Sequence, residues 1–410
     1  MRGMTEALTI GERVAFYRRR RGLSQDVLAG LVGRTEDWLS KIENNRAELD
    51  RVSVIRRIAD ALDVPLGDLL GEPTFVDWTA DSGTSTVPAL RTALMDYRSL
   101  NPVLRLTSSP PFEPVPIDDL TSNVAAVFDA YQASRFGFVT SQVPRLLSSA
   151  LHAADAYEGQ QGAQAQRLLA LAYQVAASTL TKLGECDLAW MAADRGLTAA
   201  QRSGDMTITG SLFRSVAHSL LSTGRYDAAA QLVSDGSDFL RTSLGHADAA
   251  RWSVFGSLFL AGAMASSRMD DRATTSDFLE EAGRAAGYLG HDGNYLWTAF
   301  GPTNVAIHRV ATAMELGDVQ VAVDLGPRVD TTGLPTERRV RHALETARAF
   351  STTNRREEAL ATVLDAERMA PEQVRHHFIS RQLVLSWMKN PRGTVTSELG
   401  ALAHRLRLTA

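Results

Sequence analysis

Four stretches beyond residue 118 share one pattern, in which a helical segment is followed by a short polar turn and a second helical segment. They cover residues 180–200, 220–240, 313–331 and 350–371. Their turns contain Gly184, Gly224, Gly317 and Asn354, which are separated by 40, 93 and 37 residues. The gap of 93 fits two units with a degenerate turn at 266–274, and a turn near Gly137 fits a first unit. A period near 40 predicts an α-solenoid, in which helix pairs stack one on the next.

From residue 118 to residue 410 the helical pattern continues, Ala and Leu dominate, and no stretch has a convincing strand pattern. The sequence therefore predicts an all-α fold. The turn Gly-Arg-Tyr-Asp-Ala-Ala at 224–229 resembles that of tetratricopeptide repeats (TPR), although the units here are longer than the usual ~34 residues. We expect Tyr226 to fill the gap beneath this turn. The resemblance implies a concave surface that binds a peptide, a protein partner or a small ligand.

The first 72 residues predict five short helices between residues 9 and 70. Ser24, Thr35 and Ser53 stand where a side-chain oxygen can accept hydrogen bonds from the free N–H groups that start a helix. Gly22 and Gly33 end the two helices before the third. These signals predict a compact helical domain at the start of the chain.

The sequence "RRRRGLSQDVLAGLVGRTEDWLSKIENNR" (18–46), followed by "IRRIADALDVPLGDLL" (55–70), resembles the phage-repressor/Cro type of helix-turn-helix, the XRE family. The resemblance implies that the helix after Thr35 lies in the major groove of DNA. It implies base contacts from Glu36, Asp37 and Lys41. Phosphate contacts are expected from Gln25, Thr35, Asn44, Arg46 and Arg51. A buried ion pair between Arg18 and Glu43 is also implied.

Within this motif, Leu39 and Ile42 are three residues apart, and we expect both to be buried against Leu28 and Leu31. Trp38 is expected to pack against the preceding helix.

Two acids at the start of a DNA-reading helix allow two interpretations. Glu36 and Asp37 can accept hydrogen bonds from cytosine N4, while Lys41 can donate to guanine. Alternatively, the two acids only complement the positive end of the helix. Residues 1–72 contain twelve basic and twelve acidic residues, so only a local cluster of basic residues can provide a DNA-binding face.

Residues 73–117 change in composition and are expected to form a linker with hinge freedom. Ser, Thr, Pro and Asp are concentrated at its two ends, and "PALRTALMDYRSL" (88–100) predicts one short helix between them. The expected organisation is a DNA-binding domain at 1–72, the linker, and a TPR-like sensor and dimerisation domain at 118–410.

The segment 291–318 contains a group of aromatic and polar residues that could face a ligand. Asn304 and His308 are four residues apart and share one helix face, and Arg214 and His218 repeat this spacing two units earlier. Asn side chains can hold a peptide backbone through paired donor and acceptor bonds. The candidate ligand residues are Arg214, His218, Trp297, Asn304 and His308. The alternative is an ordinary inner helix whose polar residues are solvated.

The sequence contains none of the common enzyme motifs, and we expect neither catalysis, a cofactor nor a metal site. Cys186 stands between two acids, which disfavour a thiolate, and the adjacent His376 and His377 are expected on the surface. One cysteine cannot form an internal disulfide, and no apolar run approaches the ~20 residues of a membrane span. We therefore expect a cytoplasmic protein.

Together these features predict a DNA-binding transcription regulator whose helical domain dimerises and senses a peptide or small molecule. The stretches "GPTNVAIHR" (301–309) and "APEQVRHHFISRQLV" (370–384) are similar to actinobacterial XRE–TPR regulators. The same order of domains occurs in peptide-responsive regulators of Gram-positive quorum sensing, which is an analogy only. The alternative is an interaction scaffold in which the solenoid binds a protein partner.

Overall fold

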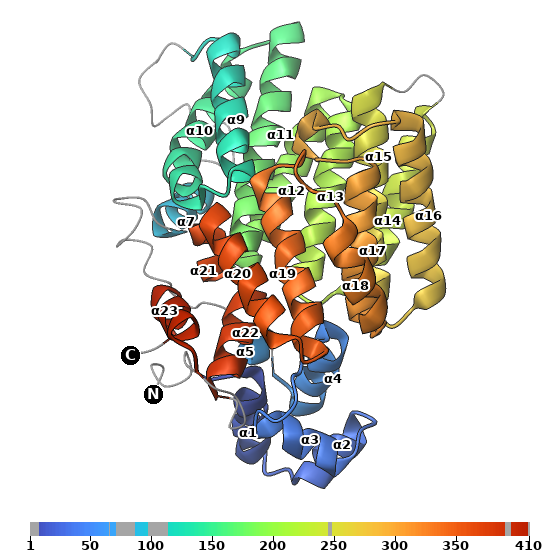
Figure 1. The fold of residues 1–410 in the computed structure, drawn as a ribbon. Helices are drawn as coiled ribbons and strands as arrows, with labels where there is room; N and C mark the ends of the chain where they lie inside the picture. Colours follow the sequence, from blue (N-terminus) through green and yellow to red (C-terminus); the bar gives the residue numbers. More distant parts are fainter. Residues whose placement is uncertain are drawn as a thin grey trace. The chain divides into compact units, whose positions relative to one another are not determined.

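The computed structural model describes residues 8–64, 66–70, 87–96, 114–244, 248–389 and 395–408. Within these ranges every regular element is helical, as Figure 1 shows. The one extended contact in these ranges is an isolated bridge between Gly293 and Phe300. The predicted all-α fold is confirmed.

The chain divides into two compact units. The first contains Met1–Val76, Ser266–Thr275 and Ala306–Ala410, and the second contains Asp77–Ala265 and Ser276–Val305. The two ends of the chain therefore belong to one unit, while the middle forms the other. The domain boundaries expected at residues 72 and 117 divide the chain into consecutive segments, and they remain a prediction.

Five short helices at the N-terminus form the start of the first unit. They are α1 (Ile10–Arg20), α2 (Gln25–Leu31), α3 (Glu36–Glu43), α4 (Val52–Leu62) and α5 (Leu66–Leu70). Leu28, Leu39 and Ile42 are buried in their common core, as expected. Leu31 was expected there and is 63% exposed instead. The buried face of α2 is centred between Leu28 and Ala29, so Leu31 falls to its side.

Two of the three predicted helix caps are confirmed. The Ser24 hydroxyl accepts a hydrogen bond from the Val27 amide at 3.2 Å, and the Thr35 hydroxyl accepts one from the Trp38 amide at 3.3 Å. The third prediction is wrong, because α4 begins at Val52 and Ser53 lies inside it.

Helices from the C-terminal part of the chain complete the first unit. They are α18 (Val319–Leu325), the 3-10 turn η4 (Gly326–Arg328), α19 (Thr336–Thr352), α20 (Arg356–Met369), α21 (Pro371–His376), α22 (Phe378–Lys389) and α23 (Ser397–Arg405). Most of α17 (Pro302–Leu316) also belongs here. Their apolar faces form a second core that includes Val340, Leu344 and Val384. His376 was expected on the surface and is only 7% exposed, because α21 packs against α19, α20 and α22.

The second unit is an array of antiparallel helices (Figure 1). Its helices are α7 (Val87–Leu94), α9 (Ile117–Gln132), α10 (Phe136–Ala156), α11 (Gly159–Lys182), α12 (Cys186–Ser203), α13 (Met206–Ser222), α14 (Tyr226–Arg241), most of α15 (Ala249–Ser267) and of α16 (Arg272–Leu289), and the 3-10 turn η3 (Tyr295–Trp297). Each of α11, α12 and α13 packs against the next helix, and α11 also contacts α13. This pattern of neighbours is that of stacked helix pairs. The linker helix predicted at 88–100 appears as α7, and most of the remaining linker lies outside the described residues.

The turns between paired helices carry a common backbone signature. A residue with positive φ ends the first helix at Gly184, Gly224, Gly317 and Asn354, the four positions expected from the repeat. Asp270 has the same conformation and divides the gap of 93 residues, so the degenerate unit is confirmed. The first turn uses Ser134 in place of Gly137, which lies inside α10.

Candidate nucleic-acid interface and ligand-facing helices

Helix α3 is fixed to its domain through one face. Leu39 and Ile42 are almost fully buried, whereas Glu36, Asp37 and Lys41 are exposed on the other side. Thr35 caps the first turn. The helix expected to read DNA is therefore anchored by its apolar face while its polar face stays accessible.

The exposed face of α3 carries an ion pair between Asp37 and Lys41. The Lys41 ammonium lies 2.6 Å from the Asp37 carboxylate, one helical turn away. Both side chains are more than half exposed, so the pair contributes only about 0.3–0.5 kcal/mol. Such a weak pair opens easily, so both groups stay available to another partner.

Trp38 is partly buried against the core of the domain, in agreement with its expected packing role. The guanidinium of Arg34 lies over its ring, 5.6 Å from the ring centre. Arg34 is exposed beside the start of α3 and was missed by the sequence analysis. Its position two residues before α3 is the sequence signal that could have marked it as a candidate.

The predicted buried pair of Arg18 and Glu43 is confirmed. Two hydrogen bonds of 2.6 and 2.8 Å join the guanidinium to the carboxylate. The amide of Gln25 also donates to Glu43, at 2.7 Å. Hydrogen bonding to Glu43 raises the pKa of Arg18. This network links α1, α2 and α3, and it holds Gln25 at the start of α2 with one amide hydrogen left to donate.

The remaining candidates for phosphate contacts lie around the end of α3, with one exception. Asn44 and Arg46 are exposed there, and the Asn44 amide donates to the Ser40 carbonyl at 2.7 Å. Arg51 is engaged elsewhere: its Nε donates to the Glu315 carbonyl at 2.7 Å, and its guanidinium pairs with Asp270. These bonds occupy the Arg51 guanidinium, which corrects the expectation that Arg51 contacts a phosphate.

The sequence model of the helix-turn-helix domain matches residues 9–72. Residues 9–72 form a helix-turn-helix domain. The match covers the five N-terminal helices and includes α2 and α3, the pair with which such domains meet DNA. The search of curated proteins found no match for this sequence.

Two solved structures of helical proteins are similar to the chain at low sequence identity. A Rap protein complexed with competence and sporulation factor is 12% identical, with a TM-score of 0.47 over 90% of this chain and 99% of that chain. BtubC (BKLC) from P. vanneervenii is 15% identical, with a TM-score of 0.38 over 55% of this chain and 90% of that chain.

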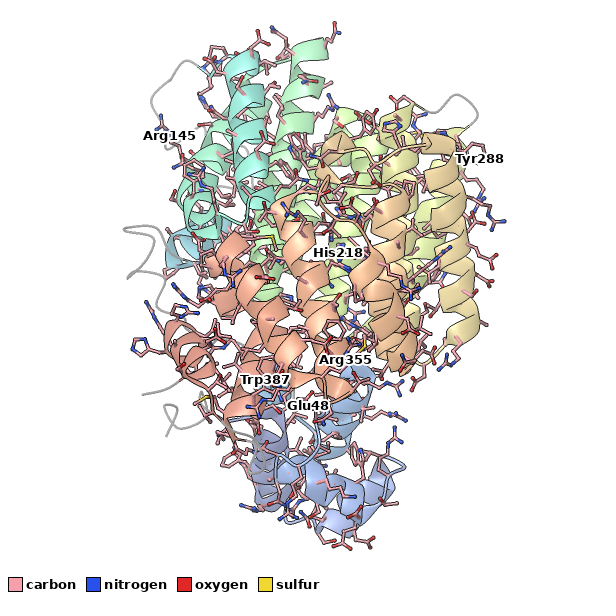
Figure 2. All side chains as sticks on the ribbon, in the orientation of Figure 1. Glu48, Arg145, His218, Tyr288, Arg355 and Trp387 are labelled. Atoms are coloured by element: carbon pink, nitrogen blue, oxygen red, sulfur yellow. The ribbon has the colours of Figure 1, made fainter. Side chains whose placement is uncertain are left out.

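Arg214 and His218 lie on α13 in the second unit, and both are partly buried. His218 is labelled in Figure 2. On the same helix, Ser211 is fully buried and accepts a hydrogen bond of 2.8 Å from the amide of Gln174 in α11. The amide oxygen of Gln174 is buried without a hydrogen-bond partner among the described residues. Buried polar atoms normally have partners, so the Gln174 oxygen is an unsatisfied acceptor at this polar seam of α11 and α13.

Trp297 belongs to a strap of residues 291–301 that joins α16 to α17. Its indole stacks on Phe128 of α9, and its N–H donates to the Asp129 carboxylate at 3.0 Å. Gln132 and Asn294 exchange amide hydrogen bonds of 2.9 and 2.8 Å beside it. The strap therefore closes on α9, at the other end of the second unit's sequence, and these bonds occupy the Trp297 ring and N–H.

The backbone of the strap is strained. Leu296, Trp297 and Ala299 all have positive φ, between 48° and 53°. Residues other than glycine adopt this conformation at a cost, and such positions cluster where binding or switching occurs. The strap is held by its bonds to α9 rather than by its own backbone preference.

The last two candidates lie on α17 but in different units. Asn304 is almost fully buried in the second unit, where its amide donates to the Ala299 carbonyl at 2.8 Å and so holds the end of the strap. His308 is 9% exposed and belongs to the first unit. The described residues contain no group of three or more His, Cys, Asp or Glu side chains that could hold a metal ion. None of the described helices is both long and apolar enough to cross a membrane.

Proposed function

We propose that this protein is a cytoplasmic transcription regulator of the XRE type and has no enzymatic activity. Its helix-turn-helix domain binds operator DNA, and its helical array dimerises and senses a peptide or small molecule. The observation that carries the proposal is the exposed polar face of α3 on a helix anchored by its apolar face. A dimer places two copies of α3 on half-sites about 34 Å apart, which compensates for the weak phosphate attraction of a domain with balanced charge.

In this proposal Lys41, Asp37 and Glu36 contact bases, while Gln25, Thr35, Asn44 and Arg46 contact phosphates. Glu36 and Asp37 also lie at the positive end of α3, where a negative charge is tolerated. We add Arg34 to the phosphate contacts because it is exposed next to this helix.

The test is selection of bound fragments from genomic DNA, followed by gel shift. Lys41→Ala should relax the preference at one base-pair position, because a base contact contributes about 1–3 kcal/mol of discrimination. Arg46→Ala should weaken binding to all sequences and reduce the salt slope by about 1. An unchanged selected sequence for Lys41→Ala contradicts its base contact, and a uniform loss would make it a phosphate contact.

A matched control is Arg145→Ala, which removes one exposed positive charge from α10, outside the helix-turn-helix domain (Figure 2). It should leave both the selected sequence and the salt slope unchanged. Absence of salt-sensitive DNA binding, together with a co-purifying protein, would instead favour the interaction scaffold.

The sensing role is supported by the polar seam at Gln174 and Ser211, near which Arg214 and His218 lie in the sequence. Mass spectrometry of molecules released from the denatured protein should find a ligand with polar groups. Gln174→Leu removes the unsatisfied amide oxygen and should reduce the amount released. If the wild-type protein releases nothing and gains no thermal stability from peptide or metabolite libraries, the sensing role is wrong.

A further inference from the structure

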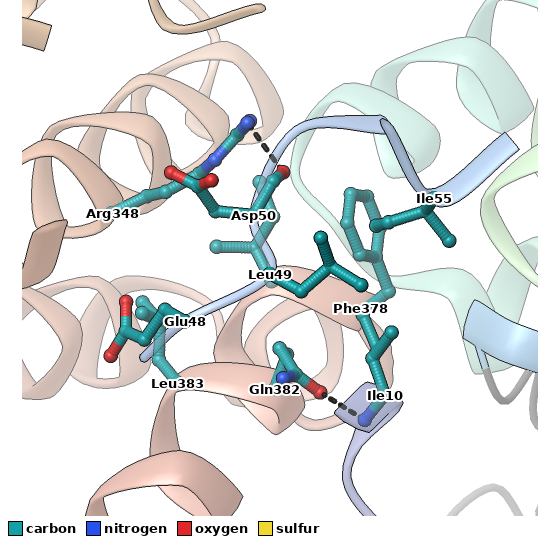
Figure 3. A pocket seen from close by; sticks show the side chains of 10 residues that line it. Ile10, Glu48, Leu49, Asp50, Ile55, Arg348, Phe378, Gln382 and Leu383 are labelled. Atoms are coloured by element: carbon teal, nitrogen blue, oxygen red, sulfur yellow. Dashed lines mark hydrogen bonds between the residues drawn. The ribbon is translucent and has the colours of Figure 1, made fainter. Parts of the chain in front are cut away.

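The helix-turn-helix domain and the C-terminal helices of the first unit share a junction at residues 48–52. This segment ends the connection from α3 to α4, and it lies beside Arg348 of α19 and Leu383 of α22 (Figure 3). Arg348 donates to the Asp50 carbonyl at 2.6 Å, and Thr352 donates to the Asp50 carboxylate at 3.1 Å. Ser351 donates to Glu48 at 2.8 Å. The backbone before α4 is thus bonded to a helix about 300 residues further along the chain.

The start of α4 receives its cap from the same part of the chain. Its N-cap residue, Arg51, makes no capping bond with its own side chain. Instead, the Glu315 carboxylate accepts a hydrogen bond of 3.2 Å from the Val52 amide. A carboxylate at this place satisfies a free N–H group and complements the positive end of the helix. Glu315 therefore does for α4 what Thr35 does for α3.

Arg51 fastens the junction from the other side. It donates to the Glu315 carbonyl at 2.7 Å and pairs with Asp270, which lies 3.6 Å from Arg57 of α4. Asp270 occupies the positive-φ turn between α15 and α16. Arg51 and Arg57 are thereby both paired with the turn between α15 and α16, which belongs to the same unit.

The carboxylate of Glu315 is itself fixed by a buried charge network. Arg348 lies 3.1 Å from both Glu315 and Glu345, and all three side chains are at most 6% exposed. Burial alone would raise the pKa of Glu315, but the charges of Arg348 and Arg268 outweigh it and lower that pKa. Glu315 is therefore ionised at the point where it meets α4, and moving it would leave Arg348 short of negative charge.

Apolar packing closes the remainder of the junction. Ile10, Leu49 and Ile55 face Phe378 and Leu383 around a cavity of about 20 Å³ (Figure 3). A space of this size holds one water at most, so it is no ligand site. Lys389 also pairs with Glu12 of α1 at 2.5 Å. None of these contacts uses the exposed face of α3, which the docked domain leaves accessible.

We propose that α17, α19 and α22 form a docking platform that fixes the orientation of the helix-turn-helix domain, with Glu315 as its positioning residue. A displacement of α17 relative to α19 moves the cap of α4 and, with it, the direction of α3. The docked form is the form that binds DNA. This inference rests on the proposed DNA-binding function for its second readout only, because docking itself is measured without DNA.

The first experiment is hydrogen–deuterium exchange of the full chain carrying Glu315→Gln. The variant keeps the shape and one acceptor oxygen but removes the charge that caps α4 and pairs with Arg348. Exchange in peptides covering residues 49–56 should become about tenfold faster, while peptides of α2 and α3 keep their protection. The matched control is Glu358→Gln in α20, whose partner Arg355 is exposed, and it should leave these rates unchanged.

Arg51→Ala provides a second variant, because it releases the same junction without leaving a buried charge unpaired. It should also speed exchange at 49–56. If both variants exchange as the wild type does, the docking platform is overturned. If Glu315→Gln loses protection throughout the chain, Arg51→Ala alone decides the test. Wild-type exchange at 49–56 in Arg51→Ala would then overturn the docking platform.

The second readout is affinity for the selected operator. If only a tenth of the variant molecules keep the competent orientation, the dissociation constant rises about tenfold. Faster exchange with unchanged operator affinity would show that the domain docks but that docking does not orient it for DNA binding. This result would overturn the positioning role of Glu315. Faster exchange in a protein whose wild type binds no DNA would refute the proposed function while leaving the platform in place.

Discussion

The indole ring of Trp297 lies parallel to the ring of Phe128, with centroids 4.2 Å apart and planes at 10°. The two residues come from the strap and from α9, and the neighbouring Asp129 accepts the indole N–H. This stack holds the strap, in which Leu296, Trp297 and Ala299 have the strained positive-φ conformation. The closed strap therefore depends on Trp297 more than on any local preference of the loop.

Trp297→Ala should destabilise the second unit by about 2 kcal/mol, less than the ~3–5 kcal/mol of a fully buried aromatic, because Trp297 is partly exposed. Urea unfolding measures the change. The matched control is Tyr288→Ala, since Tyr288 also stacks on a neighbour, Trp252, but is 72% exposed. Equal losses in the two variants would mean that the strap does not depend on the Trp297 stack.

A pair of glycine substitutions tests the packing inside the second unit. A β-carbon at Gly256 would overlap the ring of the fully buried Phe300, whereas one at Gly287 of α16 would meet nothing within 4 Å. Gly256→Ala should cost about 1–3 kcal/mol through overpacking. Gly287→Ala should stabilise by about 0.5–1 kcal/mol, because alanine is the better helix former. Thermal unfolding compares the two, and a loss in both variants would contradict the open space at Gly287.

Glu48 should make the first unit less stable as pH rises. Burial raises its pKa, and the nearby Asp50 adds to this effect, while Ser351, Ser386 and Arg348 oppose it. A carboxyl group whose folded-state pKa is raised contributes stability below its unfolded pKa and loses it as pH rises through the folded value. Glu48→Gln removes the charge, so it should stabilise at pH 7.5 and match the wild type near pH 4. An offset that stays constant with pH would argue against titration of Glu48.

His376 should have the opposite dependence on pH. Burial lowers its pKa from 6.5 to about 3, and the positive charges of Arg375, Arg381 and Arg407 contribute. The unfolded chain takes up a proton below pH 6.5 while the folded chain does not, so stability is lost as pH falls from 6.5 towards 3. The loss at pH 5 is about 2 kcal/mol.

Unfolding of His376→Gln across this range should have a flatter slope, whatever constant offset the lost packing adds. The control His404→Gln alters an exposed histidine of α23 and should keep the wild-type slope. A wild-type slope in His376→Gln would assign the acid sensitivity to other groups.

Features set by neighbouring residues were predictable from the sequence. A positive φ favours a residue without a β-carbon, so glycine marks the turns at Gly184, Gly224 and Gly317. Thr35 was recognisable because a cap bonds within three residues of itself. The same reasoning failed at Ser53, because the acceptor for α4 is Glu315, which no local pattern reveals.

The misplaced side chains have similar causes. Arg51 looked like a phosphate contact until its partners, Glu315 and Asp270, were seen to come from distant parts of the chain. Trp297 was expected to contact a ligand, but its ring stacks on Phe128 of α9. Sequence spacing places residues on a helix face, while only tertiary packing decides what covers that face.

Because Glu315 supplies the cap of α4, the helix-turn-helix domain does not contain every group that stabilises its own helices. A fragment ending near residue 72 would keep its apolar core but would lose the carboxylate that accepts the Val52 amide hydrogen. Transplanting the domain onto another helical array would require a carboxylate in the same place. The start of α4 thus depends on two segments that are more than 200 residues apart in the sequence.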